Sequence, residues 1–408
     1  MSSLHSKKVV YIHHGGSIGG APISMLQMLV TLKQQGLKPL VIFTHFGPIL
    51  EFAKNLGIST RVVTLRSAFF YGAHVPVRMR MLLSFFIYFW STVQLTKQII
   101  REEQPDLVHL NTSVLIPVAI AVKRMNVPLV WHVREVPGSN RLLRRWQTGF
   151  IMRMADIVIV NSNYVKQFFK KKDRVHVIHN ALDLQDYQID IKKKRDVIRD
   201  KFGISSSAPV VLMIGSVQTV KGHFLLVKAA REIVRIHPDV CFVIVAGGVG
   251  SEYAQSFRGR VKAVLGLPYD NRELMQRQIN RFGLDEHFVF TGYSNDIPEI
   301  LATSDIVAFL PQAAEGFGRP LIEAMASGRP VVVTDIGPSR EIIGEDTGLF
   351  VPPGDHSALV QAIVQLLKEP SLRNSMGANG RNRVAKLFSM DKHIAGIIDL
   401  YKSILRKE

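Results

Sequence analysis

The stretch that decides the fold covers residues 311–328 and reads PQAAEGFGRPLIEAMASG. A loop flanked by glycines leads here into a helical pattern, so free backbone N–H groups near Phe317–Leu321 can bind a diphosphate. Two carboxylates, Glu315 and Glu323, stand eight residues apart, which corresponds to about 12 Å in a helix. One acid can then reach each end of an extended nucleotide sugar, because sugar hydroxyls are good carboxylate partners. Glu323 alone would also suit the exposed face of a helix.

Short β-branched runs alternate with amphipathic stretches on both sides of this segment. Apparent strands in the first half are Val9–His13, Leu40–Phe43, Arg61–Leu65, Leu107–Leu110, Leu129–Val133, Ile157–Val160 and Val175–Ile178. Those in the second half are Pro209–Ile214, Cys241–Val245, His287–Phe290, Ile306–Phe309, Pro330–Val333 and Leu349–Val351. Near-continuous apolar strands separated by helices are typical of doubly wound parallel sheets. The sequence therefore predicts two Rossmann-like α/β domains that face each other across a cleft.

The pattern also predicts where these domains begin and end. Residues 1–184 form the first domain, the polar and charge-dense stretch 185–208 a linker, and residues 209–388 the second domain. The final segment, 389–408, places Ile394, Ile397, Ile398, Tyr401 and Leu405 on one face of a helix. We expect this helix to pack back toward the first domain.

Composition and charge exclude several classes of protein. The 408 residues are 47% hydrophobic and 21% charged, which excludes a mainly disordered chain. Cys241 is the only cysteine, which excludes a disulfide scaffold and suits a reducing cytoplasm. Residues 1–190 hold 23 Lys and Arg against 10 Asp and Glu, most of the net charge of +18. An anionic partner is therefore expected, and nucleic acid is disfavoured because no helix-turn-helix, RNA-stacking or finger pattern is present.

The polar start of the chain, residues 1–8, shows no secretory signal, so a cytoplasmic location is expected. The most apolar stretch, Met81–Thr96, has no charge over sixteen residues and is too short to span a bilayer, which needs about 20. Cations flank it on both sides within residues 78–101. Aromatic residues beside cations fit a helix in the interface of an anionic membrane, on its inner face, and a buried core helix fits equally well.

Two more strand-to-helix loops are candidate phosphate sites. The first contains Gly15, Gly16, Gly19 and Gly20. It lacks the dinucleotide fingerprint, and a tight turn without a ligand is the lesser alternative. The second runs from Gly215 to Gly222 and is not a P-loop, although Lys221 at a helix start suits a phosphate. A solvated lysine is the alternative there. His132 ends a strand and is by itself most often structural, while Arg134 and Glu135 could form a surface pair.

Together these residues resemble the family 4 retaining glycosyltransferases of GT-B fold. The resemblance rests on Glu315 and Glu323 within EGFG…EAMASG, on PVVVT at 330–334, and on GLFVPPGD at 348–355. Asn180 and the early glycine loop fit as well, so the likeness extends over nearly the whole chain. It implies that the first domain is the acceptor side and that the second binds the nucleotide-sugar donor.

The resemblance also implies roles for individual residues. Glu323 would bind the ribose hydroxyls, Glu315 the transferred sugar, and Lys221 the diphosphate. Further donor contacts would come from Gly15, Gly16, Gly19, Gly20, Ser216, Gly292, Tyr293, Gly316, Phe317, Gly318, Arg319, Pro320 and Leu321. His132 would lie near the reacting carbon, which makes His132, Lys221 and Glu315 the implied catalytic residues.

Two positions depart from the family pattern. Ser216 stands where the family usually has an arginine on the phosphates, and Pro22 where an acidic residue is usual. Arg319, Arg340 or another cation compensates for the arginine, or the diphosphate is bound more weakly.

The predicted activity is transfer of a sugar from a UDP-sugar or GDP-sugar with retention of anomeric configuration. No cofactor and no metal are expected, because Lys221 and helix N–H groups can stabilise the leaving diphosphate. The basic first domain indicates an anionic acceptor, such as a lipid-linked glycan of cell-surface polysaccharide or glycolipid synthesis. A nucleotide-sugar epimerase of GT-B shape and a non-catalytic sugar-nucleotide-binding protein are the alternatives.

Overall fold

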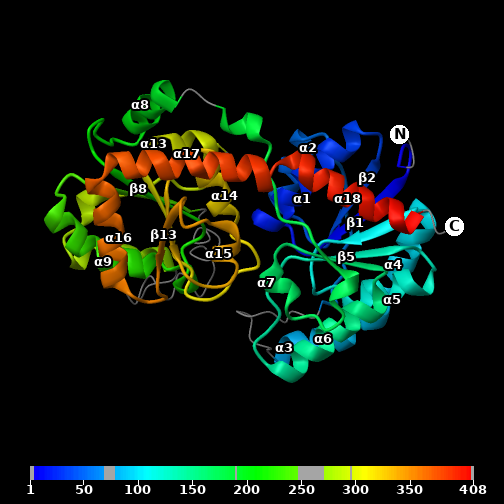
Figure 1. Cartoon of the computed structure of the whole chain (residues 1–408). Coiled ribbons are helices and arrows are strands. Elements are labelled where there is room, and N and C mark those ends of the chain that lie inside the picture. Colours follow the sequence, from blue (N-terminus) through cyan, green and yellow to red (C-terminus); the bar gives the residue numbers. More distant parts are fainter. Residues whose placement is uncertain (1–3, 69–78, 189–190, 247–270, 295, 406–408) are drawn as a thin grey trace. The chain divides into compact units, whose positions relative to one another are not determined.

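The computed structural model describes residues 4–68, 79–188, 191–246, 271–294 and 296–405 (Figure 1). The chain divides into two compact units. Unit 1 consists of Met1–Ala181, Glu315–Phe317 and Met390–Glu408, and unit 2 of Leu182–Ala314 and Gly318–Ser389. Each unit contains one parallel sheet covered by helices, as the sequence pattern predicts.

Unit 1 contains a seven-stranded sheet in the order β3-β2-β1-β4-β5-β6-β7, with all neighbours parallel. Its strands are β1 (Lys8–His13), β2 (Lys38–Phe43), β3 (Ser59–Val62), β4 (Leu107–Leu110), β5 (Leu129–Val133), β6 (Ile157–Val160) and β7 (Val175–Val177). Its helices are α1 (Gly20–Gln34), α2 (Ile49–Asn55), α3 (Met79–Ile87), α4 (Phe89–Glu103), α5 (Ile116–Arg124), α6 (Arg141–Met154), α7 (Asn163–Lys166) and α18 (Met390–Leu405), with η1 at Lys172–Arg174.

The C-terminal helix α18 packs beside α1 in unit 1 (Figure 1). Ile394, Ile397 and Tyr401, which the sequence places on one face, are buried in the hydrophobic core of this unit. The hydroxyls of Tyr401 and Tyr11 share a hydrogen bond of 2.7 Å, and His109 Nδ1 lies 2.7 Å from the Tyr401 hydroxyl. A polar chain inside the core thus fixes the register of α18, because each of these buried groups needs its partner.

Unit 2 contains a six-stranded parallel sheet in the order β10-β9-β8-β11-β12-β13. Its strands are β8 (Val210–Ile214), β9 (Cys241–Val245), β10 (Phe288–Phe290), β11 (Ile306–Phe309), β12 (Val331–Thr334) and β13 (Gly348–Val351). Its helices are α8 (Ile191–Lys201), α9 (His223–Ile236), α12 (Asn271–Arg281), α13 (Ile297–Thr303), α14 (Arg319–Ala326), α15 (Ser339–Ile342), α16 (His356–Lys368) and α17 (Pro370–Leu387), with η2 at Leu184–Tyr187, η3 at Thr219–Lys221 and η4 at Asp285–His287.

Both sheets reverse their strand order once, between β1 and β4 in unit 1 and between β8 and β11 in unit 2. In doubly wound sheets, ligands bind at such a switch point, outside the carboxyl ends of the strands. In unit 2 the loops that leave these two strands lead to Lys221 and to the Glu315–Glu323 segment. The topology therefore selects the same loops that the sequence motifs select.

Residues 185–208 are not a plain linker. They form η2 and α8, and α8 packs against α13 within unit 2. The fully buried Arg199 donates hydrogen bonds to the carbonyls of Thr303, Ser205, Ser206 and Ala208 and pairs with Asp305 at 3.2 Å. The charged residues of 185–208 predict a solvent-exposed connection. Arg199 is one of them, but it is buried and fixes α8 to unit 2.

Replacing Arg199 with methionine should lower the free energy of unfolding by about 3 kcal/mol, because several carbonyls lose their donor and Asp305 loses one of its two arginine partners. Urea denaturation measures this change. Arg340→Met is the matched control, since Arg340 also forms an ion pair in unit 2 but is exposed, and its pair contributes little in water. Equal stability of the two variants would show that Arg199 does not anchor α8.

Candidate active site

The switch point of unit 2 holds the loop that carries Lys221. This loop follows β8, ends in η3, and turns into α9 at Gly222, which has a φ of 85°. A Cβ at Gly222 would lie 1.9 Å from the carbonyl oxygen of Leu310, at the end of β11. The same two loops also share a hydrogen bond of 2.7 Å, from Gln312 N to Val220 O. Glycine at 222 therefore lets the Lys221 turn pack directly on the loop that leads to α14.

Ser216 forms a neutral hydrogen-bonded pair with Gln218 at the position where the resemblance to the family implies an arginine. Its hydroxyl accepts a hydrogen bond of 3.0 Å from Gln218 Nε2. Arg340 is bound elsewhere, because it donates to Asp335 and Glu345 and lies over the Phe350 ring. The other proposed substitute, Arg319, lies in an ion pair with Glu323.

Helix α14 places Glu323 in a largely buried position. The helix begins after Gly318, whose φ of 97° is a left-handed conformation that favours glycine. Arg319 Nε lies 2.6 Å from Glu323 Oε1, and their side chains are 10% and 8% exposed. Tyr187 of η2 forms a hydrogen bond with Arg319, and burial followed by the charge of Glu323 raises the pKa of Tyr187 well above its usual value. Glu323 is thus not an exposed helix glutamate.

The remaining candidates of unit 2 lie after β10 and in the first turn of α14. Gly292 has a φ of 76° and precedes Tyr293, whose side chain is largely exposed. Partial burial raises the pKa of the Tyr293 hydroxyl. Pro320 occupies the first turn of α14, where its missing N–H is tolerated, and Leu321 is buried.

In the glycine loop after β1 of unit 1, close packing explains why residue 16 is a glycine. A Cβ at Gly16 would lie 2.5 Å from the carbonyl oxygen of Phe46, so the loops after β1 and β2 touch at this glycine. Gly15 has a φ of 81° and donates its N–H to Thr44 Oγ1 at 2.8 Å, while nothing fills the space of its absent Cβ. Gly19 is the N-cap residue of α1, and Gly20 is the first residue of that helix.

His132 is the second-to-last residue of β5 and is completely buried. Within the described residues neither of its ring nitrogens has a hydrogen-bond partner, and the His109 ring lies 5.5 Å away. Burial, with the nearby Arg134 charge as the next cause, holds the pKa of His132 well below its usual value. His132 is therefore a neutral imidazole near pH 7.

Arg134 and Glu135 do not form a surface pair. Arg134 is buried and donates to Asn111 Oδ1 at 2.5 Å and to Asn180 Oδ1 at 2.7 Å. Glu135 instead accepts hydrogen bonds from the Thr112 hydroxyl at 2.7 Å and from Ser113 N at 3.0 Å. The carboxyl ends of β4, β5 and β7 are thus linked by a polar network that sequence reasoning missed.

The residues Glu315–Phe317 belong to unit 1 by their contacts. The Gly316 carbonyl accepts a hydrogen bond of 2.7 Å from the Ser162 hydroxyl. A Cβ at Gly316 would lie 2.1 Å from the carbonyl oxygen of Arg134. The Phe317 ring is buried, with its centroid 5.9 Å from that of His179. Glycine at 316 therefore allows this loop to touch the end of β5.

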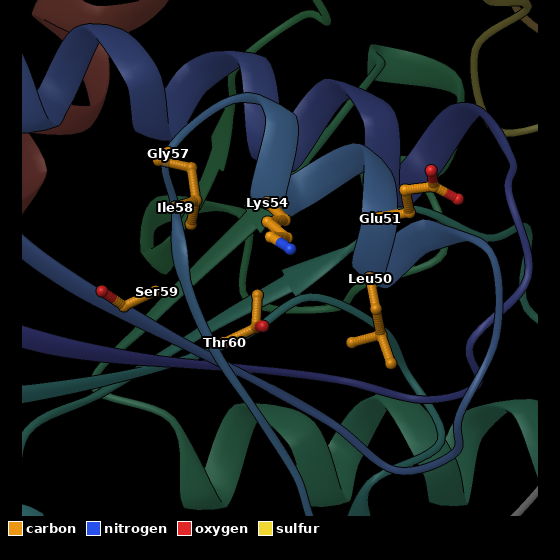
Figure 2. Close-up of a pocket in the computed structure, with 7 residues that line it drawn as sticks. All are labelled: Leu50, Glu51, Lys54, Gly57, Ile58, Ser59 and Thr60. Carbon is orange, nitrogen blue, oxygen red and sulfur yellow. The ribbon is translucent and has the colours of Figure 1, made fainter.

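A shallow hollow of about 600 Å³ lies elsewhere in unit 1, between α2 and β3 (Figure 2). It is lined by Leu50, Glu51, Lys54, Gly57, Ile58, Ser59 and Thr60. None of these is a predicted site residue, and β3 is two strands away from the switch point. In the described part of the chain, no group of three or more His, Cys, Asp or Glu residues is arranged to hold a metal ion.

Comparison with known proteins identifies the family. The sequence profile described as "Glycosyltransferase Family 4" matches residues 18–186, and that of "Glycosyl transferases group 1" matches residues 194–383. The chain belongs to glycosyltransferase family 4. It is a glycosyltransferase of GT-B fold, with the two Rossmann-like domains that the sequence predicts.

Relatives of this glycosyltransferase act on different sugars. The UDP-Gal:alpha-D-GlcNAc-diphosphoundecaprenol alpha-1,3-galactosyltransferase of Escherichia coli is 26% identical over 98% of each chain. The N-acetyl-alpha-D-glucosaminyl L-malate synthase of Bacillus anthracis is 24% identical over 76% of this chain and 78% of the other. The crystal structure of Anabaena HepE in complex with UDP and glucose has a TM-score of 0.78 at 22% identity, covering 97% of this chain and 100% of the other.

The buried histidines of the glycosyltransferase predict how its stability depends on pH. Burial lowers the pKa of His13 to about 3 and of His393 to about 4, and it lowers those of His109 and His132 well below 6.5. Below pH 6.5 the unfolded chain binds protons that the folded chain does not, so stability falls as pH falls. Each histidine contributes about 1.4 kcal/mol per pH unit in this window.

Urea denaturation between pH 7.5 and 5 measures this slope. His132→Gln should reduce the slope by the contribution of one histidine, because it removes a buried imidazole whose pKa is lowered by burial. A stability that stays constant down to pH 5 would contradict the assignment of neutral buried imidazoles.

Proposed function

We propose that this glycosyltransferase moves a sugar from a UDP-sugar or GDP-sugar to a lipid-linked or glycan acceptor with retention of anomeric configuration. The observation that carries this proposal is the position of Glu323, largely buried on α14 at the switch point of unit 2. The Escherichia coli galactosyltransferase is named for a UDP-sugar donor and a diphosphoundecaprenol-linked acceptor, which supports these substrate classes. The role is synthesis of a cell-surface polysaccharide or a glycolipid.

In this proposal each unit contributes its own part of the chemistry. In unit 2, Glu323 binds the ribose hydroxyls, Tyr293 lies beside the base, and Lys221 with the N-terminus of α14 holds the diphosphate. The bond between the anomeric carbon and the diphosphate oxygen breaks while the acceptor oxygen bonds to the same face of that carbon. The acceptor proton passes to the leaving diphosphate oxygen. Lys221 and the helix N–H groups stabilise the charge that develops there, without a metal or cofactor.

In the same proposal, residues of unit 1 contact the transferred sugar. Glu315 accepts hydrogen bonds from the sugar hydroxyls, and the Gly15–Gly20 loop covers the sugar phosphate. His132 takes part as a neutral imidazole, because its pKa is lowered by burial. Its environment excludes water, which strengthens the electrostatic interactions near the reacting carbon.

Replacing Lys221 with alanine should lower turnover by about 10²–10³-fold, because the leaving diphosphate loses a point charge. Transfer from a panel of UDP-sugars and GDP-sugars to a lipid-linked acceptor measures this loss. Lys228→Ala is the matched control, since Lys228 is exposed on α9. An unchanged rate in Lys221→Ala would remove Lys221 from the mechanism. Donor consumption that does not depend on any acceptor would contradict sugar transfer itself.

The proposed acceptor brings the enzyme to an anionic membrane. The stretch expected as one helix forms α3 and α4, which are separated at Tyr88, and Arg78 lies outside the described residues. Phe85 and Val93 are buried, so part of this stretch belongs to the core. Its other side is exposed and apolar at Met79, Leu83, Phe86, Ile87 and Trp90. None of the described helices is long and apolar enough to cross a bilayer, and the proposed contact is peripheral.

The enzyme should sediment with vesicles that contain anionic lipid and detach at high salt, because screening weakens the attraction of its cations. The double variant Phe86→Ser with Ile87→Ser should sediment less, since it loses apolar contact area. Phe46→Ser is the control, because Phe46 is 82% exposed but lies outside α3 and α4. Equal sedimentation of all three proteins would exclude α3 as the contact.

A further inference from the structure

The first turn of α14 contains an ion pair that breaks two rules of helix stability. Arg319 is the first residue of the helix, where the positive end of the helix dipole disfavours a cation. Arg319 precedes Glu323 by four residues, and this order is less stabilising than an acid that precedes a base. The pair is nonetheless short and largely buried, and burial of two charges costs solvation energy. Local conflicts of this kind are expected where a site needs them.

Tyr187 holds the same arginine from a second element. It lies in η2, which the Asp183 side chain caps by accepting a hydrogen bond of 3.0 Å from Gln185 N. Tyr187 forms a hydrogen bond with Arg319, as described above. Arg319 is therefore fixed between η2 and the carboxylate of Glu323, all within unit 2.

We propose that Arg319 is a positioning residue that sets the preference of the enzyme for ribonucleotide donors over deoxyribonucleotide donors. This inference rests on the proposed function, in which Glu323 binds the ribose hydroxyls. Arg319 holds one carboxylate oxygen of Glu323, which fixes the rotamer of the glutamate and the direction of its other oxygen. A ligand hydroxyl then meets an acceptor that is already oriented, so binding does not have to order the side chain.

A second arginine–glutamate pair in unit 2 shows what an ordinary pair looks like. Glu273 and Arg277 on α12 also stand four residues apart, at 2.7 Å, but the acid comes first and both side chains are more exposed. Such a pair contributes little beyond local helix stability. Arg277 therefore offers a control of the same residue type, spacing and unit.

Calorimetry with UDP, 2′-deoxy-UDP, GDP and 2′-deoxy-GDP tests the proposal. The wild-type enzyme should bind its ribonucleotide about 10–100-fold tighter than the 2′-deoxy form, which is the effect of one hydrogen bond to a charged group. In Arg319→Met this ratio should fall to about threefold or less, since the glutamate loses its orientation. Arg319→Lys should retain more of the ratio than Arg319→Met, and Arg277→Met all of it.

Tyr187→Phe provides a milder change that keeps the ion pair and removes only the hydroxyl. It should lower the ratio partway, and it remains informative if Arg319→Met fails to fold by circular dichroism. Unchanged ratios in Arg319→Met and Tyr187→Phe would overturn the inference and leave the proposed function intact. Equal binding of ribonucleotide and deoxyribonucleotide by the wild type would overturn it as well. Failure of the wild type to bind either UDP or GDP would instead overturn the proposed function, and the inference with it.

Discussion

Close approach of two backbones at Gly222 is the constraint on which the proposed donor site of unit 2 depends. The turn that carries Lys221 packs on Leu310, the first residue after β11, with no room for a side chain between them. Any larger residue at 222 would push this turn away from the segment that leads into α14. Gly316 plays the equivalent part in unit 1, where it allows its loop to touch the backbone of Arg134. Both candidate sites are thus built by backbone contact, and the side chains are positioned by it.

Three largely buried arginines differ in the groups that accept hydrogen bonds from their guanidinium. Arg199 donates mainly to backbone carbonyls and fixes α8 to unit 2. Arg134 donates to amide oxygens of Asn111 and Asn180 and links three strand ends of unit 1. Arg319 is bound by a carboxylate and a phenol at the start of α14, where the helix dipole disfavours a cation. Only the third arrangement conflicts with local helix energetics, which is why we propose a ligand-related role for it.

The sequence predicts the interior of each sheet closely and its margins less well. The predicted strands at Leu107–Leu110, Leu129–Val133, Ile157–Val160 and Cys241–Val245 coincide with β4, β5, β6 and β9. These strands are buried on both faces, so their residues are almost all apolar, and His109 and His132 are the exceptions. The strand predicted at Arg61–Leu65 instead begins at Ser59, because β3 is an edge strand whose partly buried residues give a weaker pattern.

Motifs within one loop were also easier to predict than contacts between distant segments. Glu323 and Lys221 were predicted as site residues from their neighbours in the chain, and the loops that leave β11 and β8 at the switch point of unit 2 lead to them. The partners of Arg134 and Arg199 come from residues up to 106 positions away. A charged residue beside other polar residues looks solvent-exposed in the sequence, and only the fold shows that its acceptors surround it.

The order of charges on α14 follows the order of groups in a nucleotide. The backbone positions of Arg319, at the positive end of the helix dipole, and of Glu323 stand about 6 Å apart along the axis, and their charged atoms meet at 2.6 Å. This polarity opposes the one that stabilises an isolated helix. A nucleoside diphosphate laid along the first turns of α14 would present phosphate at the positive end and ribose hydroxyls at the acid. The same ion pair that weakens the helix therefore complements the proposed donor, and it does so at a site where Ser216 supplies no cation of its own.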